Sequence, residues 1–170
     1  MIIGNGDMAA GVTDFHDTLI FVSGVSDSSE TSVIKFEREY SLIREAIEKY
    51  SDMHLVYISS LSIYESNTPY TKHKINVENI VKIFCEDYSI LRIGNITWGN
   101  NPKTIINFLK NKIKREDPYM VQDVYRNIIG KDELNYWIKT AVNQQITELN
   151  VTGERIKVEE IVTRIRDGRL

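Results

Sequence analysis

Cysteine and clustered metal ligands are what this chain has least of. It contains one cysteine, Cys85, so neither a disulfide framework nor a cysteine cage for a metal can be built. Its three histidines, His16, His54 and His73, are scattered, with no acidic companion at ligand spacing. We therefore expect no metal site, and the composition suits a reducing, cytoplasmic compartment.

An excess of one charge is also lacking. The 170 residues include 21 basic and 24 acidic side chains, which are well mixed, and the formal net charge is -3. Binding to a phosphate backbone requires a basic stripe on the surface. Nucleic acid is therefore not an expected partner.

Long apolar runs are missing as well. No stretch approaches the roughly 20 apolar residues that span a bilayer, and the first residues lack the pattern of a signal peptide. No repeat or low-complexity linker divides the chain, and its length suits one domain. We expect a single soluble domain over residues 1–170, with no membrane partner.

What the chain does contain is an alternation of short β-branched runs with longer stretches of helical period. Strands are expected at Met1–Ile3, Leu19–Ser23, Leu55–Ser59 and Ser89–Ile93. Helices are expected at 31–50, 69–87, 103–115, 131–143 and 157–166. This alternation is typical of βαβ units and predicts an α/β fold with a parallel sheet.

A glycine segment, IIGNGDMAAG, places Gly4, Gly6 and Ala9 directly after the first expected strand. In a dinucleotide-binding fold the first glycine permits a tight turn and the second lets the backbone approach a pyrophosphate. A small third residue lets a helix pack on the strand. Taken alone, the segment is equally consistent with a glycine turn that leaves an edge strand.

The segment LVYISSLSIY places Ser59, Ser60 and Ser62 at the carboxyl end of the third expected strand. Open α/β sheets bind their ligands at that end of their strands. Serines are also ordinary turn formers. Position therefore favours a ligand site here without excluding a plain turn.

The next segment, PYTKHK, begins a helix. Thr68 can cap this helix and Pro69 can occupy its first position, which puts Tyr70 in the first turn with Lys74 on the same face. Because a neighbouring ammonium favours the phenolate, Lys74 would lower the pKa of Tyr70 from its usual value of about 10. The alternative is a surface tyrosine beside a solvated lysine.

The order of these segments resembles that of extended short-chain dehydrogenases/reductases, and among them the NAD-dependent epimerase/dehydratase family that acts on sugars and nucleotide sugars. Further stretches that resemble the family are LIFVSGVSDS (19–28), LRIGNITWGNN (91–101), VYRNIIGKDEL (124–134) and ELNVTGERIKVEEIV (148–162). The resemblance implies a Rossmann-like parallel sheet flanked by helices that binds NAD or NADP.

The resemblance also implies roles for single residues. Ser60 would hold the substrate oxygen, Tyr70 would be the acid/base, and Lys74 would hydrogen-bond the nicotinamide ribose. The cofactor would contact Gly4, Gly6, Asp7, Met8, Ser23, Gly24, Ser59, Tyr70, Lys74 and Asn95, and the sugar substrate would contact Ser62 and Arg126. For Arg126 a solvated loop position is a near-equal alternative, and Asn95 is suited to tying backbone together near the nicotinamide.

The chain departs from the family between Gly4 and Leu19. Family members carry two further strands there, which hold the residue that reads the adenosine ribose, whereas here only 14 residues intervene. Asp14 or Asp17 could contact that ribose, although both are better described as solvated acidic residues in a loop. We therefore predict a truncated sheet of about four to six strands with the glycine strand at or near an edge.

Two functions stay open at this point. One is an NAD(P)-dependent oxidoreductase or epimerase of a sugar or nucleotide sugar, in carbohydrate biosynthesis, and the other is a non-catalytic dinucleotide-binding or partner-binding module. The intact Ser60, Tyr70 and Lys74 favour the first, and the missing strands favour the second. The resemblance also implies a homodimer through the helices at 31–50 and 69–87.

Overall fold

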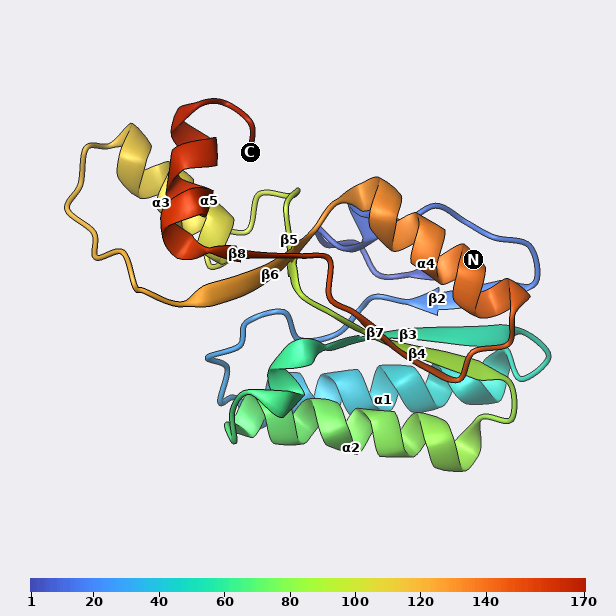
Figure 1. Ribbon diagram of the computed structural model, residues 1–170. Coiled ribbons are helices and arrows are strands. Elements are labelled where there is room, and N and C mark those ends of the chain that lie inside the picture. The colour runs from blue at the N-terminus through green and yellow to red at the C-terminus, as the bar shows by residue number, and fades with distance from the viewer.

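Strands and helices alternate along the chain in the computed structural model, which describes residues 1–170 (Figure 1). In chain order the elements are β1 (Ile2–Ile3), β2 (Thr18–Phe21), α1 (Val33–Lys49), β3 (His54–Ser60), α2 (Pro69–Phe84), β4 (Tyr88–Ile93), β5 (Asn95–Ile96), α3 (Ile105–Lys114), β6 (Tyr125–Ile129), α4 (Lys131–Asn143), β7 (Glu148–Val151), β8 (Glu154–Lys157) and α5 (Val158–Arg166). The four expected strands and five expected helices are all present, with ends that differ by at most three residues.

The main sheet has five strands in the order β1-β2-β3-β4-β7, and every neighbouring pair is parallel. Central strands are buried on both faces, as parallel strands covered by helices are, and all four residues of β2 are buried. The α/β class with a parallel sheet of about five strands is confirmed. The glycine strand β1 lies at one edge, as predicted.

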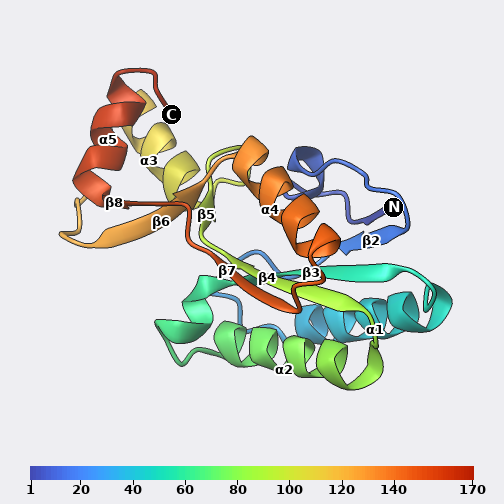
Figure 2. The same cartoon turned by 45° about the vertical axis from the view of Figure 1, so that its right-hand side comes forward.

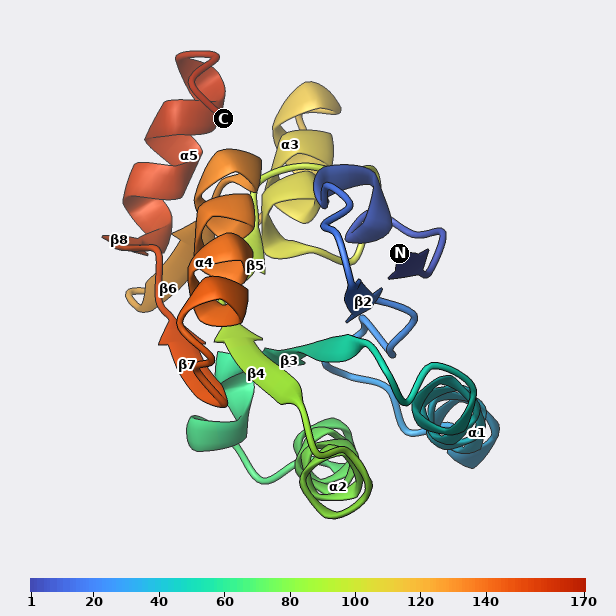
Figure 3. The ribbon, with the colours of Figure 1, turned by 90° about the vertical axis from the view of Figure 1, so that its right-hand side faces the viewer.

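Helices cover both faces of this sheet. Figure 3 shows α1 and α2 side by side on one face and α4 on the other. Under α1 and α2, the buried residues include Leu19 and Phe21 of β2 with Ile43 and Val77 of the helices. Because strand side chains alternate between faces, Ile20 packs instead in the cluster that contains Leu134 and Ile138 of α4.

A smaller sheet, β5-β6-β8, lies beside the carboxyl end of the main sheet (Figure 2). β5 pairs with β6 in parallel and β6 pairs with β8 antiparallel. Helices α3 and α5 pack on it through a separate core of Ile106, Leu109, Ile128, Ile156, Val158, Ile161 and Val162. None of the helices combines the length and apolarity that crossing a membrane would require.

The connection from β1 to β2 contains one 3-10 turn, Ala9–Gly11, and no α-helix. Gly4 has φ +144°, and a Cβ there would lie 2.8 Å from the Val22 carbonyl oxygen, so the chain needs glycine at this turn. A Cβ on Gly11 would lie 2.3 Å from the Trp98 ring. The connection between β1 and β2 is therefore a tight turn packed on the loop after β5.

Candidate cofactor and substrate site

A cavity of about 1040 Å³ opens at the carboxyl ends of β2, β3 and β4. Ligands of open α/β sheets bind at this end of the strands because the loops that follow the strands meet there. Every site residue predicted from the sequence lines the cavity except Gly4. Segments from distant parts of the chain are thus brought together in one place.

The glycine loop forms one wall of this cavity. Nothing lies within 4 Å of a Cβ built on Gly6, so its backbone is open to a ligand. Asp7 fastens the loop to the segment after β5, because its carboxylate accepts from the Asn101 amide at 2.7 Å and its carbonyl accepts from Trp98 Nε1 at 2.7 Å. The side chain of Asp7 is therefore occupied within the protein.

The serines after β3 form a second wall. Ser60 caps a 3-10 turn, Leu61–Tyr64, and its hydroxyl oxygen accepts from the Ser62 amide at 3.2 Å. The Ser60 and Ser62 hydroxyls lie 2.8 Å apart. The Ser59 hydroxyl instead donates to the buried carboxylate of Glu78 at 2.6 Å. Ser60 and Ser62 thus present hydroxyls at the cavity, while that of Ser59 stabilises the scaffold.

Tyr70 and Lys74 enter the site from the first turn of α2. Thr68 caps that helix with a reciprocal capping box to Thr71, and Pro69 occupies an N-terminal position, as the sequence predicts. Tyr70 is 6% exposed and Lys74 is 3% exposed. The Lys74 ammonium lies 5.9 Å from the centroid of the Tyr70 ring.

The Lys74 ammonium is paired with a carboxylate that the motif does not include. Lys74 Nζ donates to Glu39 Oε1 at 2.9 Å and to the Tyr57 hydroxyl at 3.2 Å. Burial is the largest single influence and by itself would lower the pKa of Lys74. The charge and hydrogen bond of Glu39, together with the charges of Tyr70 and Glu78, outweigh it, so that this pKa is raised. Burial also raises the pKa of Tyr57, and the Glu39 charge adds to this increase, so Tyr57 stays a neutral hydrogen-bond donor.

The remaining predicted residues differ in how firmly they are held. Asn95 donates to the Asn127 carbonyl at 3.1 Å, which ties β5 to β6. Ser23 accepts from the Arg38 guanidinium at 3.2 Å. Arg126 is half-buried and makes one long hydrogen bond, 3.5 Å to the Tyr125 carbonyl. Its guanidinium is therefore the least committed cation around the cavity.

Sequence reasoning missed Glu39, His73 and a contact across the cavity mouth. A signal existed for Glu39, because position 39 lies on the apolar face of α1 with Phe36 and Ile43, where a carboxylate needs a buried partner. At the mouth, Lys103 pairs with Asp27. This pair joins the β2–α1 loop to the β5–α3 loop, 76 residues away, and sequence spacing gives no sign of it.

The arrangement suits one half of a nicotinamide dinucleotide better than the other. Hydroxyls, Lys74 and the open backbone at Gly6 line the part of the cavity that could hold a nicotinamide and its ribose. No strand of the chain lies beyond β1, and no α-helix follows the glycine loop to offer its N-terminus to a pyrophosphate. No group of three or more histidine, cysteine or acidic residues is placed to hold a metal.

The serine, the tyrosine and the lysine thus lie at one cavity at the carboxyl end of a Rossmann-like parallel sheet, which is where open α/β sheets bind their ligands. No protein-family model and no curated protein matches the sequence. Solved structures do match the fold. WbmH of Bordetella bronchiseptica in complex with NAD+ has a TM-score of 0.75 at 13% identity, over 89% of this chain and 57% of that chain.

Two further solved structures agree. WbmG of the same organism, in complex with NAD and UDP, has a TM-score of 0.70 at 15% identity, over 90% of this chain and 56% of that chain. UDP-glucose 4-epimerase of Thermus thermophilus, in complex with NAD, has a TM-score of 0.71 at 17% identity, over 90% of this chain and 62% of that chain. The chain has the fold expected from the resemblance and spans about three fifths of these proteins' length.

Proposed function

We propose that this chain is an NAD(P)-dependent oxidoreductase or epimerase that acts on a sugar or nucleotide sugar, in carbohydrate biosynthesis in the cytoplasm. The observation that carries the proposal is the convergence of Ser60, Tyr70 and Lys74 on one cavity at the carboxyl end of a parallel sheet. The solved structures of the same fold include a UDP-glucose 4-epimerase bound to NAD and the enzyme WbmG bound to NAD and UDP.

In this proposal the chain's own residues bind, orient and move a proton. Lys74 hydrogen-bonds the ribose next to the nicotinamide, and its charge stabilises the phenolate form of Tyr70. Ser60 holds the substrate oxygen. The Tyr70 hydroxyl gives its proton to that oxygen when a carbonyl becomes an alcohol, and takes one back in the reverse direction. The bound nicotinamide would supply or accept the hydride.

Ser62 and Arg126 are proposed to contact the substrate. The Arg126 guanidinium is a planar donor suited to a phosphate or carboxylate, and it has no strong partner within the chain. The cofactor contacts are proposed at Gly4, Gly6, Ser23, Gly24 and Asn95, together with Asp7, Met8, Ser59, Tyr70 and Lys74. Because no strand beyond β1 covers the adenosine half of the cofactor, we expect NAD(P) to bind more weakly here than in a complete dinucleotide-binding pocket.

A homodimer through α1 and α2 is part of the proposal. These helices carry large apolar side chains at the surface: Ile34 is 82% exposed, Ile83 is 72% exposed and Phe84 is 60% exposed. Ile34 lies in the first turn of α1 and the other two lie in the last turn of α2, and the proposed association would cover these exposed apolar side chains.

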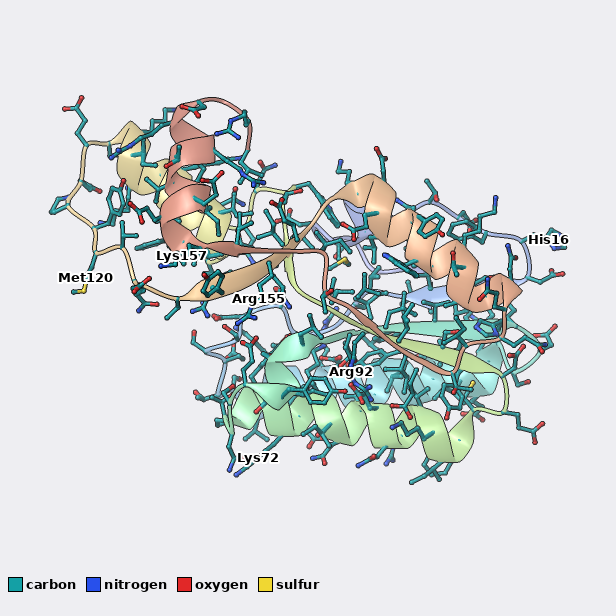
Figure 4. All side chains as sticks on the ribbon, in the orientation of Figure 1. His16, Lys72, Arg92, Met120, Arg155 and Lys157 are labelled. Carbon is teal, nitrogen blue, oxygen red and sulfur yellow. The ribbon has the colours of Figure 1, made fainter.

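The experiment that tests the function is a titration with NADH and NADPH, followed by nicotinamide fluorescence and calorimetry. We expect the wild type to bind, and Lys74→Met to bind more weakly because a ribose contact is lost. Lys72→Met is the matched control, since Lys72 lies on the same helix and projects away from the body of the protein (Figure 4). It should bind as the wild type does.

One observation favours a second function. The connection after β1 has no α-helix and β1 has no outer neighbour, so the pyrophosphate and adenosine contacts of a full pocket are reduced. A chain that kept the fold without turnover would act as a non-catalytic dinucleotide-binding or partner-binding module. Absence of binding at millimolar NADH and NADPH by a folded protein would favour a partner-binding module over the enzyme.

A further inference from the structure

A buried polar cluster lies beneath the cavity, and Glu39 is at its centre. The Glu39 carboxylate is fully buried and accepts from four groups on three segments. Oε1 accepts from Lys74 Nζ at 2.9 Å and from the Tyr57 hydroxyl at 2.9 Å, while Oε2 accepts from His73 Nε2 at 2.8 Å and the Val25 amide at 2.6 Å. Every direction in which this carboxylate can accept is therefore used.

The cluster leaves one donor of Lys74 unassigned. An ammonium has three N–H groups. One N–H of Lys74 donates to Glu39 and a second donates to Tyr57, so the third has no partner in the cluster. Lys74 also lines the cavity although it is almost fully buried. The third N–H is the group that a ligand in the cavity can use.

The backbone at Gly24 lies close above the ion pair and restricts the space around it. A Cβ built on Gly24 would lie 2.6 Å from Lys74 Nζ and 2.7 Å from Glu39 Oε1. The two charged atoms are thus packed directly against the chain where it leaves β2, and His73 closes the other side, stacked on Phe36 at 4.5 Å. The ammonium has a single position rather than the range that an exposed lysine explores.

Charge balance keeps this lysine cationic. A lysine buried without a partner loses its proton readily, since burial disfavours the charged form. Burial would likewise raise the pKa of Glu39, but Lys74, the His73 N–H and the Val25 amide hold it far below its usual range. The titratable groups around Nζ are Glu39 from α1, Tyr57 from β3, and Tyr70, His73 and Glu78 from α2.

We propose that Glu39 is a positioning residue that clamps the Lys74 ammonium beneath Gly24 with one N–H directed at the cavity, where it meets an oxygen of the bound ligand. The naming of that ligand as a nicotinamide ribose rests on the proposed function. The clamp itself rests on the contacts of Glu39 and does not depend on turnover.

The decisive variant is Glu39→Gln, with Glu45→Gln as the matched control because Glu45 is an exposed glutamate on the same helix. The first measurement is the pH titration of the Lys74 ¹³Cε and ¹⁵Nζ resonances, assigned by comparison with Lys74→Met. In the wild type and in Glu45→Gln, Lys74 should stay protonated beyond the ordinary lysine pKa of about 10.4. In Glu39→Gln it should deprotonate below that value, because burial is no longer offset.

The second measurement is NADH binding as a function of pH. Loss of a correctly placed charge-assisted hydrogen bond should weaken binding by roughly 10-fold to 100-fold in Glu39→Gln. Binding should weaken further as the pH rises through the lowered Lys74 pKa. A Lys74 titration in Glu39→Gln that matches the wild type would overturn the proposal. If no variant binds NADH while the Lys74 titration shifts as expected, the clamp stands and the proposed function fails.

A second variant covers the case in which Glu39→Gln does not fold. Gly24→Ala keeps both charges and adds a methyl group that must displace them, since it would lie 2.6 Å from Nζ. The Lys74 resonances should shift, and NADH binding should weaken, although the lysine stays protonated. Unchanged resonances and unchanged binding in this variant would contradict a fixed ammonium.

Discussion

Glu78→Gln would remove one charge from an ion pair that supports the serine wall of the site. Glu78 lies on α2, and its side chain is 4% exposed. It accepts from Arg92 Nε at 2.9 Å, from Arg92 Nη2 at 2.5 Å and from the Ser59 hydroxyl at 2.6 Å. Arg92 is in β4, and Figure 4 shows it between the main sheet and α2.

The expected cost follows from burial. Glutamine keeps one acceptor but turns an N–H₂ group toward the guanidinium, so Arg92 loses a buried counter-charge. Breaking a buried ion pair by removing one partner costs about 3–5 kcal/mol. For a domain of this size, 1 kcal/mol corresponds to roughly 2–4 °C in Tm, so Tm should fall by about 6–20 °C.

The same arginine supplies the control. Arg92 Nη2 also contacts Glu148 at 2.5 Å, but the Glu148 side chain is 38% exposed and is shared with Lys82. An exposed pair of this kind contributes about 0–1 kcal/mol, so Glu148→Gln should change the free energy of unfolding by less than about 1 kcal/mol.

Urea unfolding at pH 7, followed by circular dichroism and tryptophan fluorescence, measures both variants. Equal losses in Glu78→Gln and Glu148→Gln would refute the argument, because Glu78 is buried and accepts two N–H groups of Arg92 whereas Glu148 is partly exposed and accepts one. A loss below about 1 kcal/mol in Glu78→Gln would show that water reaches this pair.

Three further predictions concern the site and the assembly. Tyr70→Phe keeps the ring and removes only the hydroxyl, so NADH binding should survive while turnover falls by roughly 100-fold to 10,000-fold. Lys74→Met should weaken binding. Full activity in Tyr70→Phe on an identified substrate would exclude proton transfer by Tyr70. The pKa of Asp27 is lowered to about 2 by its lysine partner at the cavity mouth and by Ser29. Because the pKa of Asp27 is depressed in the folded protein, its ion pair stabilises the fold above the ordinary pKa of about 3.9, and this stabilisation is lost as the pH falls toward 2. Hydrogen exchange in the β2–α1 loop should therefore rise over that pH interval. Asp27→Asn should show the faster exchange already at pH 5. Sedimentation should show a dimer, and a 19.7 kDa species at all micromolar concentrations would contradict the α1–α2 association.

Local features of the sequence were enough for most of the main sheet and its helices. The limits of α4 and the start of α2 follow from helical period and from Thr68 and Pro69, since these signals act within one turn of a helix. The small sheet was harder to predict. β5 has two residues, and β6 reads YRNII, with one exposed, two half-buried and two buried positions, so neither shows a clear period of two.

The sequence by itself determined that Tyr70 and Lys74 share a helix face, because residues four apart on a helix are neighbours whatever surrounds them. It also predicted that β1 lies at or near an edge, because the 14 residues between Gly4 and Leu19 are too few for two more strands and their connections. Only the tertiary structure decided what Lys74 touches. Its partner Glu39 is 35 residues away on another helix, and that contact depends on how α1 and α2 pack on the sheet, which no local pattern specifies.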